Sequence, residues 1–263
     1  MTTTITTTLA ATDLGRGGPA LLHLPGWCGG REVFDPLHVR ASEHRRAVSV
    51  DWPGHGRTPD PGTDFGAAEL VSRTVELADE LELEAFVPVA LSHAGWVGLE
   101  LRRRLGADRV PAVVLLDWMP LGAPPPFAGA LAALQDPDAW TEARTALFAM
   151  WAHGVQDPAV HSYIASMGEY GSAMWSRAGR EIAQAFEAEP VPLDAFAALA
   201  VPCPVLHLYG QPRDDEFLAA QQAYADTHPW FAAHRLEASS HFPCLEVPEQ
   251  VAAAIEQFLA VRW

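Results

Sequence analysis

The chain has 263 residues, 49% of them hydrophobic and 19% charged, and its 33 acidic and 17 basic residues give a formal net charge of −16. This length and composition predict one large globular domain with an insertion. No apolar run reaches the ~18 residues that a membrane span needs, so we expect no membrane role. So acidic a chain repels nucleic acid and anionic lipid, which excludes nucleic acid as a partner.

The N-terminus, Met-Thr-Thr-Thr-Ile-Thr, lacks the basic start and the apolar core of a secretion signal. The three cysteines, Cys28, Cys203 and Cys244, have the spacing of neither a disulfide framework nor a metal site. We therefore expect a cytoplasmic protein with free thiols.

The first part of the chain alternates predicted strands and helices. Residues 3–10 alternate Thr with apolar residues, and 19–24 form an apolar run after a glycine turn, so we expect an opening hairpin and an antiparallel sheet edge. A helix is predicted over about 32–43, a strand over 46–50, and a helix with an apolar stripe over 67–81.

The second part keeps this alternation around a long helical segment. Strands are predicted at 112–116, 205–209 and 233–236, and a final amphipathic helix at 251–259. Between the first two of these strands, residues 120–200 show only helical patterns rich in Ala, Trp and Met. The fold class is therefore α/β, with a mostly parallel, doubly wound sheet. We expect a core formed by 1–119 and 201–263 and a helical cap formed by 120–200.

An apolar strand that ends in Ser92 and turns at once into a helix has the pattern of a nucleophile elbow. In that turn the serine side chain is exposed at the top of the sheet, and the backbone N–H of the next residue, His93, points at the same spot as an anion donor. The usual glycines two residues before and after the serine are Ala90 and Ala94 here. Small residues preserve the geometry, but the departure puts ordinary ester chemistry in question.

Three residues at predicted strand ends follow the order Ser92, Asp117, His241, which is that of the α/β-hydrolase fold. A histidine that acts as a base near neutral pH must be held in one tautomer by a carboxylate. We favour Asp117 as that carboxylate because it directly ends an apolar strand. Asp214 and Asp215, after the next strand, are the alternative, in a segment that also has the composition of a solvated loop.

Aromatic residues are frequent near the predicted strand tops and in the cap. Trp27 follows the strand whose loop supplies the second N–H of an anion hole in this fold, and Trp175 lies in the cap. Both also fit a purely structural role. Nine tryptophans in a chain of this length nevertheless favour a flat aromatic ligand held by stacking.

The chain resembles the cofactor-free ring-cleaving dioxygenases of the α/β-hydrolase fold, which act on 3-hydroxy-4(1H)-quinolones with 2-methyl or longer 2-alkyl groups. The resemblance runs nearly end to end. The elbow and the Asp-Trp pair after the next strand are its most specific motifs. It rests on Leu24-Pro-Gly-Trp27-Cys28, Trp52-x-Gly-His-Gly56, Ser92-His93-x-Gly95-Trp96-Val97, Asp117-Trp118, Tyr170-Gly-x-x-x-Trp175, Gln211-Pro212, His228-Pro-Trp-Phe231 and His241-Phe-Pro243.

The resemblance implies a reaction of an aromatic substrate with dioxygen, without metal or flavin. His241, oriented by Asp117, would take the proton of the 3-hydroxyl group, and the anion would react with oxygen, release carbon monoxide and leave an N-acylanthranilate. Ser92 would hydrogen-bond the substrate rather than attack it. The backbone N–H groups of Trp27 and His93 would stabilise oxyanion character, and Trp175 would line the pocket.

Two positions depart from the family pattern, which has a histidine directly before the elbow serine and another two residues after the loop tryptophan. This chain has Leu91 and Gly29 there. Both exchanges make the expected pocket less polar, which suits a longer alkyl substituent.

Two other functions remain open from the sequence. One is a serine esterase, amidase or thioesterase that uses Ser92, Asp117 and His241. The other is a binding protein on a hydrolase scaffold, because a fold does not fix a function.

Overall fold

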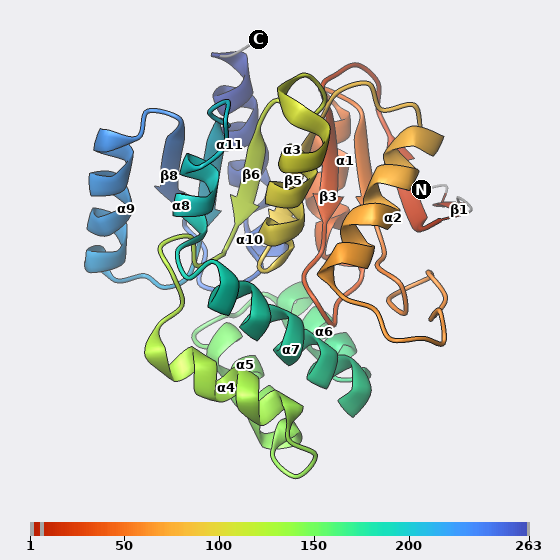
Figure 1. The fold of residues 1–263 in the computed structure, drawn as a ribbon, viewed down its shortest axis with the longest axis vertical. Coiled ribbons are helices and arrows are strands. Elements are labelled where there is room, and N and C mark those ends of the chain that lie inside the picture. The colour runs from red at the N-terminus through yellow and green to blue at the C-terminus, as the bar shows by residue number, and fades with distance from the viewer. Residues whose placement is uncertain (1–2, 6–7, 262–263) are drawn as a thin grey trace.

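The computed structural model describes residues 3–5 and 8–261. Within these residues one eight-stranded sheet has the strand order β1-β2-β4-β3-β5-β6-β7-β8 (Figure 1). The strands are β1 Thr3–Ile5, β2 Ala10–Leu14, β3 Ala20–Leu24, β4 Ala47–Val50, β5 Phe86–Leu91, β6 Val113–Leu116, β7 Val205–Tyr209 and β8 Phe231–Arg235.

The sheet begins with the expected antiparallel edge, since β1 pairs antiparallel with β2 and β2 with β4, whereas all pairs from β4 to β8 are parallel. The expected hairpin has a different second strand. It joins β1 to β2, and the run at 20–24 forms β3 between β4 and β5. All five residues of β3 are buried, so this strand needs cover on both faces and cannot lie at an edge. Residues 6–7 of the predicted first strand lie outside the described residues.

Helices cover both faces of the sheet (Figure 1). Helices α2 and α3 pack against each other on one face, and α1 and α11 pack together on the other. α3 is interrupted near its end by Gly106, whose φ of 76° is left-handed. The helices of the core are α1 Asp35–Ser42, α2 Ala67–Glu80, α3 Ala94–Arg109, α9 Asp215–Thr227, α10 Pro243–Glu246 and α11 Pro248–Ala260, with a short 3-10 helix at Arg31–Phe34.

A helical insertion separates β6 from β7, as predicted. It contains α4 Pro125–Gln135, α5 Trp140–Trp151, α6 Pro158–Met167, α7 Ser172–Ala188 and α8 Pro192–Ala197. Helices α4 to α7 lie beyond the carboxyl ends of the parallel strands, whereas α8 lies beside α3 (Figure 1). The division into a core and a cap at residues 120 and 200 stays a prediction.

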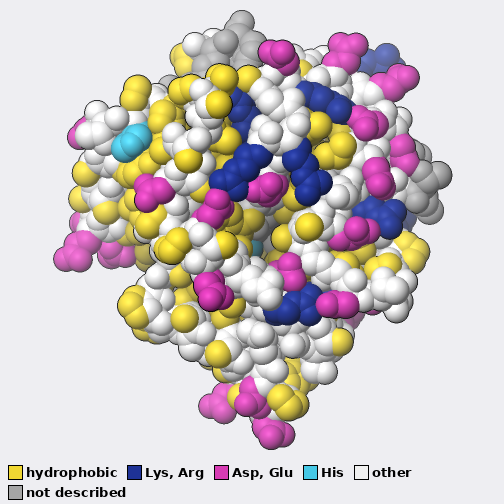
Figure 2. Space-filling view, in the orientation of Figure 1, with side chains coloured by type: hydrophobic (Ala, Val, Ile, Leu, Met, Phe, Trp, Pro, Cys, Tyr) yellow, Lys and Arg dark blue, Asp and Glu magenta, His cyan; other side chains and the backbone are white. Residues whose placement is uncertain are grey.

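The surface is rich in paired charges. Figure 2 shows arginine side chains lying beside aspartate and glutamate on one face of the molecule. The ion pairs include Arg103 with Glu189 and Arg180 with Asp64, at 2.5 and 2.9 Å. Among the described residues no helix has the length and apolar character to cross a bilayer.

Five buried histidines make the fold sensitive to acid. Burial is the main cause that lowers their pKa values. The pKa is about 4 for His38, His55 and His207, about 3 for His93, and well below 6.5 for His23. Because these rings stay neutral in the folded chain, the unfolded chain binds more protons as the pH falls below about 6.5.

We predict that the free energy of unfolding is highest above about pH 6.5 and falls as the pH drops towards 4. Each such histidine contributes a slope of up to about 1.4 kcal/mol per pH unit in that window. Urea denaturation at pH 7.5, 6.5 and 5.5 measures this slope. An unfolding free energy that does not change across these three values would contradict the burial of these rings.

Candidate active site

The elbow places Ser92 at the carboxyl end of a fully buried strand. All six residues of β5 are buried, and α3 begins two residues after the serine. Ser92 has a φ of 55°, in the left-handed region that non-glycine residues rarely adopt. Its N–H donates to Leu116 O at 2.8 Å, which ties the turn to the end of β6. The positive φ that exposes this side chain costs about 1–3 kcal/mol of backbone strain.

The next strand end, after β6, provides the carboxylate. Asp117 also has a positive φ, 47°, and its side chain is only 3% exposed. Its Oδ2 accepts hydrogen bonds from Gly210 N at 2.6 Å and Gln211 N at 3.3 Å. Its Oδ1 lies 3.1 Å from His241 Nδ1. Because two backbone donors hold one oxygen, the other is fixed towards the histidine.

The alternative carboxylates lie elsewhere. Asp214 caps α9 by accepting from Phe217 N at 2.7 Å, and Asp215 pairs with Arg235 at 2.9 Å. Both act in the loop and helix after β7. The structure therefore brings Asp117, and neither of these two, to His241.

The loop that carries His241 is held from two sides. Glu246 accepts hydrogen bonds from the N–H groups of Ser239 and Ser240 at 2.7 to 3.0 Å. The Gln211 side chain donates to Ser239 O at 2.6 Å. With these contacts the loop after β8 holds its backbone close to the Asp117 turn.

Trp151, at the end of α5, stacks on the His241 ring, with centroids 5.0 Å apart and planes 12° from parallel. The sequence shows that aromatic residues are frequent in the cap, but it does not single out this one. Its aromatic type was the only available signal, because the contact joins residues 90 positions apart. The cap therefore helps to fix the ring of the histidine.

Two backbone N–H groups are available to an anion. Within residues 3–5 and 8–261, neither Trp27 N–H nor His93 N–H donates a hydrogen bond to a protein group. The loop that carries Trp27 is braced by His55, whose Nε2 accepts from Cys28 N at 3.0 Å. Its Nδ1 lies 2.9 Å from Pro53 O, so the ring fits the loop-bracing role rather than a catalytic one.

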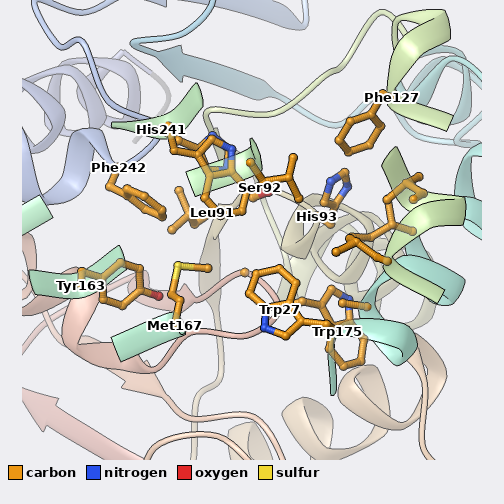
Figure 3. Close-up of a pocket in the computed structure, with 17 residues that line it drawn as sticks. Trp27, Leu91, Ser92, His93, Phe127, Tyr163, Met167, Trp175, His241 and Phe242 are labelled. Carbon is orange, nitrogen blue, oxygen red and sulfur yellow. The ribbon is translucent and has the colours of Figure 1, made fainter. Parts of the chain in front are cut away.

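One cavity of about 50 Å³ lies between the sheet and the cap, and its wall includes Ser92, His93, His241 and Trp27. Figure 3 shows Ser92, His93 and His241 along one side, with Trp27 and Trp175 facing them. The rest of the wall is apolar: Gly26, Leu91, Phe127, Leu131, Leu134, Leu147, Trp151, Tyr163, Met167, Ala178, Ile182 and Phe242. In the described part of the chain no three histidine, cysteine or carboxylate side chains converge as metal ligands.

Known proteins share the sequence pattern and the fold of this chain. The alpha/beta hydrolase family model matches residues 21–254. A solved structure of a relative, AqDC, in complex with its product from ring cleavage of the Pseudomonas quinolone signal, has a TM-score of 0.91 and 38% identity, and the match covers 99% of this chain and 100% of that one. A 2-heptyl-3-hydroxy-4(1H)-quinolone dioxygenase of Mycobacteroides abscessus is 40% identical over 246 residues, 92% of this chain and 91% of that protein. The chain belongs to the quinolone dioxygenase family of the α/β-hydrolase fold.

A second relative in the quinolone dioxygenase family has a lower sequence identity to this chain. The 1H-3-hydroxy-4-oxoquinoline 2,4-dioxygenase of Pseudomonas putida is 31% identical over 242 residues, 92% of this chain and 91% of that protein. The family resemblance drawn from the motifs is thereby confirmed, and so is the fold class. The roles of the individual site residues stay predictions.

The two departures from the expected family pattern have structural consequences. Leu91 is 1% exposed and adds an apolar side chain to the cavity wall. Gly29 makes room for Tyr163, because a Cβ atom on Gly29 would lie 1.9 Å from the Tyr163 hydroxyl oxygen and 2.8 Å from its Cζ. In this quinolone dioxygenase a tyrosine from α6 therefore fills the space beside position 29.

We predict that Gly29→Ala destabilises the protein by about 1–3 kcal/mol, the usual cost of overpacking, because Tyr163 must move. The cost should be smaller in a Tyr163→Phe background, which removes the atom in closest conflict. Thermal unfolding of the four proteins of this double-mutant cycle measures the coupling. Equal costs in both backgrounds would show that the two positions do not compete for space.

Proposed function

We propose that this quinolone dioxygenase cleaves the heteroaromatic ring of a 2-alkyl-3-hydroxy-4(1H)-quinolone with dioxygen, without a metal or organic cofactor. The products are carbon monoxide and an N-acylanthranilate. The observation that carries the proposal is the His241–Asp117 pair, which opens onto a cavity with aromatic and aliphatic walls. The relative from Mycobacteroides abscessus, 40% identical, acts on the 2-heptyl compound.

His241 is the proposed base. Asp117 Oδ1 accepts a hydrogen bond from His241 Nδ1–H, so the lone pair of Nε2 is free to take the proton of the 3-hydroxyl group. The resulting electron-rich anion reacts with dioxygen itself. The peroxide closes across the ring, both oxygen atoms enter the organic product, and the carbon between the two cleaved bonds leaves as carbon monoxide.

The remaining site residues position the substrate. The free backbone N–H groups of Trp27 and His93 donate hydrogen bonds to the substrate oxygen on which negative charge develops. Trp27 and Trp175 hold the flat ring system by stacking. Ser92 donates a hydrogen bond to the substrate.

The cavity is much smaller than the pockets of about 300 Å³ or more that hold ligands of this size. Cap side chains therefore move when the substrate binds.

Free, buried thiols at Cys28, Cys203 and Cys244 suit a reducing compartment, and we propose a cytoplasmic location.

The second candidate function is a serine hydrolase that attacks an ester or thioester with Ser92. The elbow geometry favours it, as does the presence of a histidine and an aspartate in the same site. Against it, no hydrogen bond joins Ser92 Oγ to His241 among the described residues, whereas an activated serine usually lies within hydrogen-bonding reach of its base.

We predict that His241→Ala lowers kcat for the quinolone by about 10²–10⁴, the loss expected for one proton-transfer group. Ser92→Ala should keep a measurable fraction of the activity, because the proposed base is intact. A serine hydrolase would lose nearly all its activity in both variants. Near-normal turnover by His241→Ala would remove this histidine from the mechanism.

We further predict one carbon monoxide released per dioxygen consumed, and faster turnover of the 2-heptyl than of the 2-methyl quinolone. The apolar wall that includes Leu91 favours the longer chain. An oxygen electrode with gas analysis measures both, and metal analysis of the active protein serves as the control for the absence of a metal cofactor. Oxygen uptake without carbon monoxide would contradict the reaction, and equal rates for the two quinolones would contradict the chain preference.

A further inference from the structure

We propose that Trp118 is a positioning residue that fixes the tautomer of His93, and that His207 anchors Trp118 in turn. The relevance to catalysis rests on the proposed function. The arrangement of the three side chains does not.

Trp118 directly follows Asp117 and is 2% exposed. Its indole ring lies flat against the elbow helix, because a Cβ atom on Gly95 would lie 2.4 Å from the ring. Trp96 packs against it edge to face, with centroids 5.0 Å apart. This close contact explains why the elbow motif has a glycine at position 95, and it leaves the indole little freedom to rotate.

The indole N–H of Trp118 donates to His93 Nδ1 at 3.3 Å. An indole nitrogen can only donate, so His93 Nδ1 must carry a lone pair. Burial, with a smaller effect of the nearby His241, lowers the pKa of His93 to about 3, so the ring is neutral at neutral pH. A neutral imidazole with a lone pair on Nδ1 carries its proton on Nε2.

This tautomer matters because the His93 ring lines the cavity between Ser92 and Phe127 (Figure 3). With its proton on Nε2 the ring is a hydrogen-bond donor on the side away from Trp118. In the other tautomer that nitrogen would present a lone pair, which repels the anion that His241 generates. Trp118 therefore selects the tautomer that suits an anionic substrate.

His207 holds the backbone of the same turn. Its Nε2 accepts from Trp118 N–H at 3.2 Å, and its Nδ1 lies 2.5 Å from Gln221 Oε1. Both His207 and Gln221 are fully buried. Because a backbone N–H must donate and an amide oxygen must accept, His207 has its proton on Nδ1, the opposite tautomer from His93.

Strands β6 and β7 thus connect the Asp117–His241 pair to the His93 ring. From β7, His207 anchors Trp118 while Gly210, three residues later, holds the Asp117 carboxylate. One turn after β6 therefore orients the proposed base, His241, through Asp117 and the side chain of His93 through Trp118. Neither Trp118 nor His207 lines the cavity, so both act through other residues.

Nitrogen-15 NMR of the whole wild-type protein tests the arrangement without any substrate. We expect the Nε2–H tautomer for His93 and the Nδ1–H tautomer for His207 in the same spectrum. Trp118→Phe should give a mixture of tautomers at His93 and a kcat lower by about 2- to 10-fold, as expected for the loss of a hydrogen bond between two neutral groups.

The matched control is Trp140→Phe, which makes the same exchange at a partly buried indole. That ring packs under Arg144, and it touches neither the cavity nor Trp118, so tautomers and kcat should stay as in the wild type. An Nδ1–H or charged His93 in the wild type would overturn the proposal, as would an unchanged tautomer and kcat in Trp118→Phe. If the wild type leaves quinolones unchanged, the proposed function fails, whereas the tautomers still decide the arrangement.

Discussion

The site depends on the hydrogen bond between His241 Nδ1 and Asp117 Oδ1. The two residues are 124 positions apart, and the parallel sheet brings them together because β6 and β8 end at the same edge with β7 between them. The β7 strand also contributes, since Gly210 and Gln211 hold the second carboxylate oxygen. Remote parts of the chain thus serve to keep one imidazole in one tautomer.

The same edge of the sheet concentrates backbone strain. Four non-glycine residues of the described chain have positive φ values, and Cys28, Ser92 and Asp117 are three of them. Each lies directly after or close to the end of a parallel strand. The strands below, which are buried on both faces and apolar except for His23, stabilise conformations that would be unfavourable in isolation. The cap then covers these turns and leaves a cavity with mostly apolar walls beside His241 and Ser92.

The sequence was informative where the signal is local. The apolar strand before Ser92, the strand before Asp117 and the helical segment between β6 and β7 follow from periodicity and turn residues, and the structure has them. The position of β3 in the centre of the sheet did not follow, because a short apolar run does not specify its neighbours. The stack of Trp151 on His241 depends on long-range packing, which no local pattern encodes.

The account is tested most directly by the protonation state of the bound substrate. A 2-alkyl-3-hydroxy-4(1H)-quinolone is mixed with the protein under strict exclusion of oxygen, and its absorbance spectrum is recorded with the wild type and with Asp117→Asn. The account predicts the anion in the wild type and the neutral form in the variant, whose amide would turn a donor towards His241. A neutral substrate in the wild type, or the same amount of anion in both proteins, would contradict it.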